Sequence, residues 1–135
     1  MSFQSSDLTP SQLEFMRENL LATLTTLRAD GSPHVVPVGF TFDTDNNIVR
    51  VITFAKSMKA RHAAQGGRAV VSQVDRGRWI TLEGTVRLRT EADVVAKAVE
   101  AYAARYRQPK VREDRVVVEI TIDKVMGRAL SLIHI

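Results

Sequence analysis

The chain has 135 residues, 44% hydrophobic and 25% charged, which is typical of one folded domain over 1–135. It has no cysteine, which excludes disulfides, thiolate metal sites and a cysteine nucleophile and fits a cytoplasmic protein. No apolar run approaches the roughly 18 residues of a membrane span. Lys and Arg outnumber Asp and Glu by 19 to 15, but these basic residues are scattered, so a small anion is at least as good a partner as nucleic acid.

Turn signals divide the first half of the chain into a short helix and three strands. Thr9 and Pro10 are typical of a helix N-cap and first position, and they predict a short N-terminal helix. Two turns rich in Asp, Asn and Gly then separate runs of β-forming residues. The predicted strands are 21–28, 33–42 and 48–54. We expect these three strands to pair in chain order as a meander.

The second half alternates strands with two helices. Ser57 predicts the N-cap of a helix over 58–65 that stops at Gly66, and Gly84 predicts a bend in a long strand. The remaining predicted elements are strands 68–74 and 78–90, helix 91–106, loop 107–115 and one or two strands in 116–130. Many strands with only short helices favour a mainly β, α+β fold, an antiparallel barrel whose exposed apolar face is covered by a second copy in a homodimer.

The segment 49–62 is the most informative for function. A strand there ends at a helix start that carries three cations, Lys56, Lys59 and Arg61. Unpaired N–H groups at a helix N-terminus together with cations are typical of a phosphate site. The alternative is a basic helix face in contact with water.

Pro37 and Trp79 are the other unusual residues. Proline inside the apolar run 35–38 removes a backbone hydrogen-bond donor, so it predicts a strand edge or a bulge. This feature is either an ordinary barrel edge or a place where unpaired backbone groups bind a planar ligand. Trp79 fits a cofactor contact, a dimer contact or a core position equally well. His34, His62 and His134 lack metal-site spacing and no serine-hydrolase motif is present, so no metal and no catalytic residue is assigned, as expected when a cofactor performs the chemistry.

Three segments in order, 21–43, 51–62 and 72–88, resemble the FMN-binding split-barrel superfamily of pyridoxamine-phosphate-oxidase-like proteins. Segments 102–109 and 114–120 add a resemblance to the actinobacterial branch that uses the deazaflavin coenzyme F420, in particular its biliverdin-reductase-type members. This resemblance implies a homodimer of split barrels with two cofactor sites at the interface, each built from both subunits.

The resemblance also implies roles for individual residues. The cofactor phosphate would be bound by Lys59 and Arg61, with Lys56 and Ala60 beside them. The ring would be flanked by Val36, Pro37, Val38, Thr53, Phe54 and Ala55 and touched by Gln73 and Trp79. Arg78 is the candidate for binding the propionates of a tetrapyrrole substrate.

The implied activity is hydride transfer from reduced F420 to a conjugated acceptor, with a biliverdin-type tetrapyrrole favoured. Three alternatives stay open at the level of sequence. They are an FMN-dependent oxidoreductase of the same fold, a non-catalytic carrier of flavin or haem-derived pigment, and, more distantly, a nucleic-acid-binding barrel.

Overall fold

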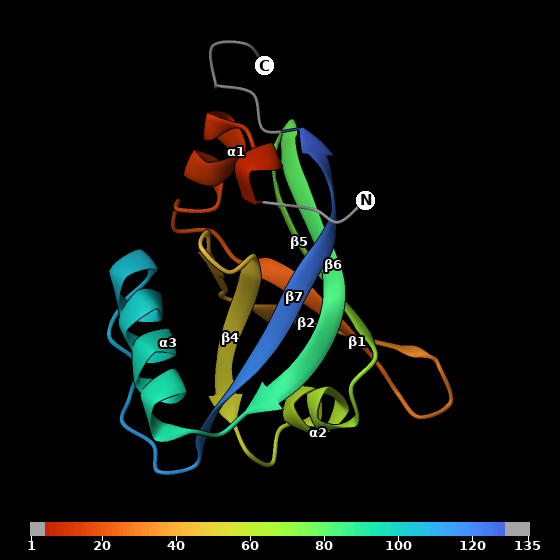
Figure 1. Cartoon of the computed structure of the whole chain (residues 1–135), viewed down its shortest axis with the longest axis vertical. Coiled ribbons are helices and arrows are strands. Elements are labelled where there is room, and N and C mark those ends of the chain that lie inside the picture. Colours follow the sequence, from red (N-terminus) through yellow and green to blue (C-terminus); the bar gives the residue numbers. More distant parts are fainter. Residues whose placement is uncertain (1–4, 129–135) are drawn as a thin grey trace.

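The sheet of this protein coils around its core, with helices at its outer face and ends (Figure 1). The computed structural model describes residues 5–128. Its strands are β1 (Ala22–Leu27), β2 (Pro33–Val38), β3 (Thr41–Asp43), β4 (Ile48–Phe54), β5 (Arg68–Asp75), β6 (Arg78–Arg89) and β7 (Arg115–Arg128). Its helices are η1 (Ser5–Asp7), α1 (Pro10–Phe15), α2 (Met58–Gln65) and α3 (Ala92–Arg105). The predicted mainly β, antiparallel fold is confirmed.

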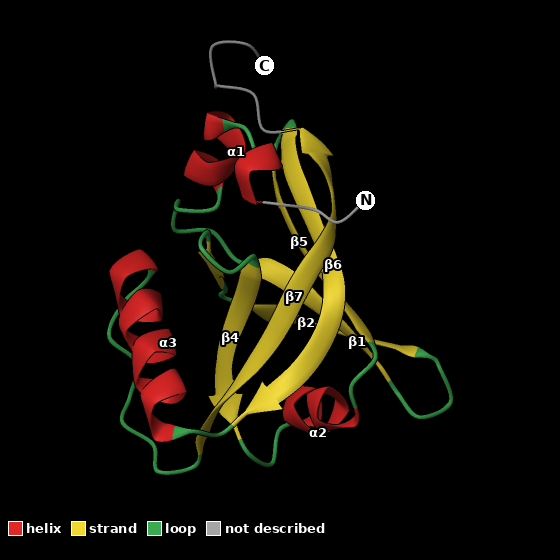
Figure 2. Cartoon of the chain, viewed as in Figure 1, coloured by secondary structure: helices red, strands yellow, loops and turns green. Residues whose placement is uncertain are grey.

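The strand order is β2-β1-β5-β6-β7-β4-β3, so consecutive strands β2 and β3 stand at opposite ends of the sheet. Only Gly39 and Phe40 connect them, and the coiling of the sheet brings its two ends together as a split barrel (Figure 2). The prediction of one strand over 33–42 and of a meander is therefore wrong. Phe40 is fully buried, and the chain changes partner there, from β1 before it to β4 after it.

Capping signals in the sequence correctly predict where two helices begin. Thr9 and Gln12 form a reciprocal capping box at α1, with Thr9 Oγ1 accepting from the Gln12 N–H at 3.1 Å. At α2, Ser57 Oγ accepts from the Ala60 N–H at 3.2 Å. Gly66 ends that helix with a φ of 78°, a conformation that glycine adopts without strain.

The predicted bend at Gly84 is confirmed as a register shift in the β6–β7 pairing. A Cβ atom at this position would lie 1.8 Å from the Thr121 carbonyl oxygen, so only glycine allows the two strands to approach. The bend lets β6 and β7 curve together over their long shared ladder. These two strands form the spine to which β5 and β4 attach on either side.

The core lies inside the coiled sheet. Its members come from all of the long strands and from α1, and include Phe15, Leu24, Phe40, Val49, Val51, Val71, Ile80, Leu82, Val118 and Ile120. Helix α3 packs against β3, β4 and β7, with Ala98 buried in that contact, while α2 packs at the end of the barrel near β6 and β7 (Figure 1). Helix α2 therefore begins shortly after β4 ends, and it carries Lys59 and Arg61 at this end of the barrel.

Candidate cofactor site

A groove opens where the two ends of the sheet fail to pair. Strand β3 pairs only with Ile48–Arg50, so the later part of β4, from Val51 onward, has a ladder with β7 alone within the described residues. Strand β2 likewise has a ladder on one side only, with β1. Both edges leave backbone N–H and C=O groups for a ligand. The predicted edge position of Pro37 is thereby confirmed.

The groove has a volume of about 200 Å³. It is lined by Pro37, Val38, Gly39, Val51, Ile52, Lys59, Tyr102, Pro109 and Arg115. Two of these residues, Lys59 and Arg115, are cations, and none is a carboxylate. The other lining residues are mostly apolar in type, while polar atoms make up the larger part of the exposed wall, so the groove suits a flat ring system with polar edges and an anionic group.

Lys59 is the charged residue that most clearly points to a ligand. Burial lowers the pKa of its ammonium below the ordinary 10.5. No described carboxylate pairs with it, although six arginines elsewhere in the chain take part in ion pairs. A partly buried cation without a counter-ion gains stability from a bound anion.

The residues around Lys59 fix the start of α2. Thr53 is buried, and its hydroxyl donates to Ser57 Oγ at 3.0 Å, while that oxygen caps Ala60. Thr53 and Ala60 thus hold the helix start in place, and their side chains are buried. This chain of bonds positions Lys59 over the groove.

The remaining predicted residues of this segment lie outside the groove lining. Lys56 and Arg61 are exposed at the same end of α2. Phe54 is partly exposed and carries the Arg112 guanidinium 4.5 Å from its ring centre, and the Ala55 N–H donates to the Asp114 carbonyl at 2.9 Å. Of the three predicted cations, only Lys59 lines the groove, and Lys56 and Arg61 lie near it in the sequence on the exposed surface.

Gln73 and Arg78, predicted to touch cofactor and substrate, are buried and bonded within their own chain. Gln73 donates to the Phe15 carbonyl at 2.9 Å and accepts from Arg105 at 2.6 Å. Arg78 pairs with Glu18 and Asp75. The structure does not bring either side chain to the groove, because both already satisfy buried polar groups near α1.

Sequence reasoning missed six of the nine lining residues. They are Gly39, Val51, Ile52, Tyr102, Pro109 and Arg115. Tyr102 lies in the segment 102–109, and Arg115 lies in the segment 114–120. Both segments carry the family resemblance, and this resemblance was the one feature of the sequence that could have indicated these two lining residues. A Cβ atom on Gly39 would lie 3.0 Å from the rings of Tyr102 and Tyr106, so glycine permits α3 to approach the groove closely.

A face of the sheet with several exposed apolar side chains adjoins the groove. The register places Val35 and Pro37 of β2, Val74 of β5, Trp79 of β6 and Met126 of β7 on the same side of the sheet. Val36, by contrast, faces the core. Val74 is 68% exposed and Met126 57%, and Trp79 lies directly opposite Val74. Between Pro37 and Met126 the register places the hydroxyl residues Thr23, Ser72 and Thr81, so the face is mixed. Several large exposed apolar side chains on one face are nevertheless typical of an interaction surface.

A family model described as "Pyridoxamine 5'-phosphate oxidase" matches residues 8–128. The chain belongs to this family. It is also 51% identical over 122 residues to the F420H(2)-dependent biliverdin reductase of Mycobacterium tuberculosis (strain CDC 1551 / Oshkosh), with 90% of this chain and 89% of that protein covered. The family resemblance stated from the sequence is confirmed.

Solved structures with low sequence identity share the family fold. An "F420 Reductase" superposes with a TM-score of 0.68 at 21% identity, covering 84% of this chain and 94% of its own. The conserved hypothetical protein Rv2991 from Mycobacterium tuberculosis superposes with a TM-score of 0.73 at 21% identity, covering 93% and 89%. Among residues 5–128, no helix is long and apolar enough to cross a membrane.

Proposed function

We propose that this protein is an F420H2-dependent reductase that transfers a hydride to a conjugated acceptor, a biliverdin-type tetrapyrrole being favoured. The observation that carries the proposal is the 51% identity, over 90% of the chain, to a relative named for that reaction. The groove supports it independently, because it presents a lysine without a described ion-pair partner, a second cation and no carboxylate among mostly apolar residues. The cytoplasmic location predicted from the sequence stays a prediction.

The described residues fit a phosphate-bearing ring cofactor. Lys59 and Arg115 would hold the phosphate, with the exposed cations Lys56 and Arg61 attracting the rest of an acidic tail. Pro37 and the free edge of β4 would face the ring, where open backbone groups can bond its polar edge. Bound there, reduced F420 supplies a hydride, which is the chemistry that the protein's own side chains lack.

The site is completed by a second copy of the chain. One subunit offers about 200 Å³, less than the roughly 300–1,000 Å³ of most small-molecule sites, so a tricyclic cofactor and its acceptor need another wall. Pro37 belongs both to the groove and to the sheet face on which Trp79 and other apolar side chains are exposed. Pairing through that face would bury the apolar residues and place the partner beside the cofactor. In this arrangement, Trp79 contacts the cofactor or lines the dimer contact.

The protein's contribution to the reaction is orientation and charge neutralisation. Lys59 and Arg115 would anchor the cofactor at one end, and the rigid sheet edges would fix its plane. The dimer contact would exclude water from the face where the acceptor lies. Because Arg78 is engaged in its own chain, the exposed cations at the start of α2 are the better candidates for binding acceptor carboxylates.

Steady-state turnover tests this proposal. The purified protein is mixed with biliverdin and reduced F420, and repeated oxidation of the coenzyme is followed by its absorbance. We expect many turnovers per site, whereas a pigment or flavin carrier would bind its ligand without repeated oxidation. Reduced FMN serves as the comparison, because faster turnover or tighter binding with FMN would contradict the F420 assignment and favour an FMN-dependent oxidoreductase.

A further inference from the structure

A second cavity lies between the start of α3 and strands β4, β6 and β7. It has a volume of about 280 Å³ and shares no lining residue with the groove at Lys59. Its charged lining consists of four cations, Arg50, Arg87, Arg89 and Lys97, and two carboxylates, Asp93 and Glu119. The cations therefore outnumber the carboxylates at its wall.

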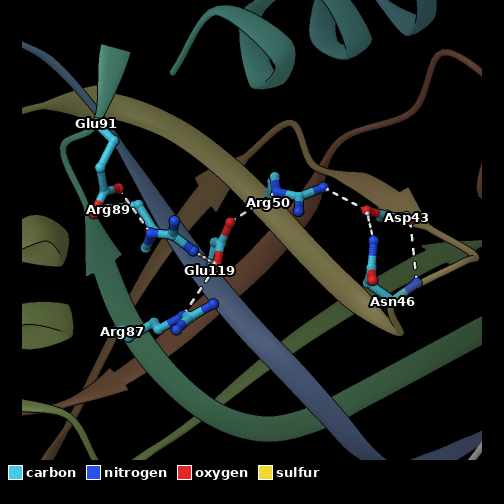
Figure 3. A network of polar contacts seen from close by, with 7 residues as sticks. All are labelled: Asp43, Asn46, Arg50, Arg87, Arg89, Glu91 and Glu119. Atoms are coloured by element: carbon cyan, nitrogen blue, oxygen red, sulfur yellow. Dashed lines mark hydrogen bonds and ion pairs between the residues drawn. The ribbon is translucent and has the colours of Figure 1, made fainter. Parts of the chain in front are cut away.

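Glu119 stands at the centre of this cluster and is fully buried (Figure 3). The strand register places Arg50 of β4 and Arg87 of β6 directly opposite it on β7. Arg50 Nε donates to Glu119 Oε2 at 2.9 Å, while Arg87 Nε and Arg89 Nη1 donate to Oε1 at 3.1 and 3.2 Å. Three guanidinium groups thus surround one carboxylate, whose two oxygens are both occupied.

The arginines differ in how fully their donors are used. Arg50 also donates to Asp43 at 2.9 Å, and Arg89 also donates to Glu91 at 2.8 Å (Figure 3). Arg87 bonds through Nε alone, its side chain is 57% exposed, and its terminal nitrogens bond to no residue in 5–128. Lys97 lines the cavity without an ion-pair partner in the same range. A closed structural network would use these donors within the chain.

We propose that this cavity binds a small oxyanion, a phosphate group or a dicarboxylate, between Arg87 and Lys97. The planar guanidinium offers two free nitrogens that match paired oxygens, and the ammonium supplies a second charge across the cavity. The three arginines balance the carboxylates of Asp43, Glu91 and Glu119, so the network is close to neutral and the spare donors of Arg87, together with Lys97, would hold the anion. Asp93 lies at the same wall, and its carboxylate opposes binding of a highly charged anion.

Nuclear magnetic resonance of the ¹⁵N-labelled chain tests the site. Inorganic phosphate, succinate and chloride are titrated at matched ionic strength, and the signals of the Arg87 Nε–H and of backbone amides 93–97 are followed. We expect phosphate or succinate to shift these signals with a saturable dependence, and the tighter of the two identifies the ligand class. Shifts that grow linearly, or that chloride produces equally, would overturn the proposal.

Lys97→Gln provides the decisive variant, because it removes a cation that holds no described partner and so leaves the Glu119 network intact. We expect it to weaken oxyanion binding at least about ten-fold, the usual effect of losing one charge-assisted bond. The exposed Lys110→Gln, with the same change in net charge, is expected to bind like the wild type. Equal binding by the wild type and Lys97→Gln would show that Lys97 takes no part and would overturn the proposed site, and no saturable binding by the wild type would show that the cluster is only structural.

Discussion

Replacing Lys59 with glutamine removes a partly buried cation of the groove that has no described carboxylate partner, while keeping a polar side chain. A charge-assisted hydrogen bond to phosphate is worth about 1.5–3 kcal/mol. In the free protein this ammonium is already partly removed from water without a partner. Binding of the phosphate therefore gains the free energy of the hydrogen bond with little further desolvation of the lysine. We therefore expect the dissociation constant for F420 to rise about 10- to 150-fold.

Titration of F420 fluorescence against each protein measures this change. Lys110→Gln, in the exposed loop before β7, is the charge-matched control and should bind F420 within about two-fold of the wild type, since losses from exposed charges are small. The thermal stability of Lys59→Gln should not fall, because no described ion pair is lost. An unchanged dissociation constant would refute this reasoning and favour the alternative that α2 is a basic surface helix without a bound phosphate.

Three further predictions test the fold, the protonation of a buried histidine and the dimer. Gly84→Ala should lower the free energy of unfolding by about 1–3 kcal/mol in urea denaturation, because its Cβ would overlap the Thr121 carbonyl; wild-type stability would contradict this account of the bend. Burial, together with the charge of neighbouring His34, lowers the pKa of His62 below 6.5, so the unfolded chain binds more protons than the folded one. The free energy of unfolding should therefore fall as the pH drops below about 6.5. A melting temperature that stays constant from pH 7 to about 5 would contradict this prediction. Trp79→Glu should shift the protein from dimer to monomer in analytical ultracentrifugation, and a wild-type monomer would disprove the proposed pairing.

Local signals in the sequence predicted most elements of the fold. Thr9 and Ser57 act as helix caps because capping depends on backbone groups within a few positions. Gly84 was predictable as a bend because a glycine interrupts a run of β-forming residues, although the contact that requires glycine is with Thr121 on β7. The strand order was not predictable in the same way. The run 33–42 has continuous β-forming residues, and its division at Gly39 depends on contacts with Tyr102 and Tyr106, more than 60 positions later.

The candidate site shows the same limit. Lys59 and Pro37 were predicted from a helix start and from a proline in a strand, which are local features. Arg115 joins them only through the pairing of β7 with β4. Gln73 and Arg78 lie outside the groove because they bond to Phe15 and Glu18 in their own chain, and nothing near them in the sequence indicates these partners. Burial and partners are tertiary properties, so sequence patterns alone did not separate ligand contacts from internal bonds.

The pKa of Lys59, measured by nuclear magnetic resonance of its side chain in the free and F420-bound protein, tests the central claim most directly. Free Lys59 should titrate below 10.5, because burial disfavours its charge. Contact with the cofactor phosphate should raise the pKa, since a neighbouring anion favours the ammonium form. An identical pKa in both states would contradict the claim that this lysine holds the cofactor.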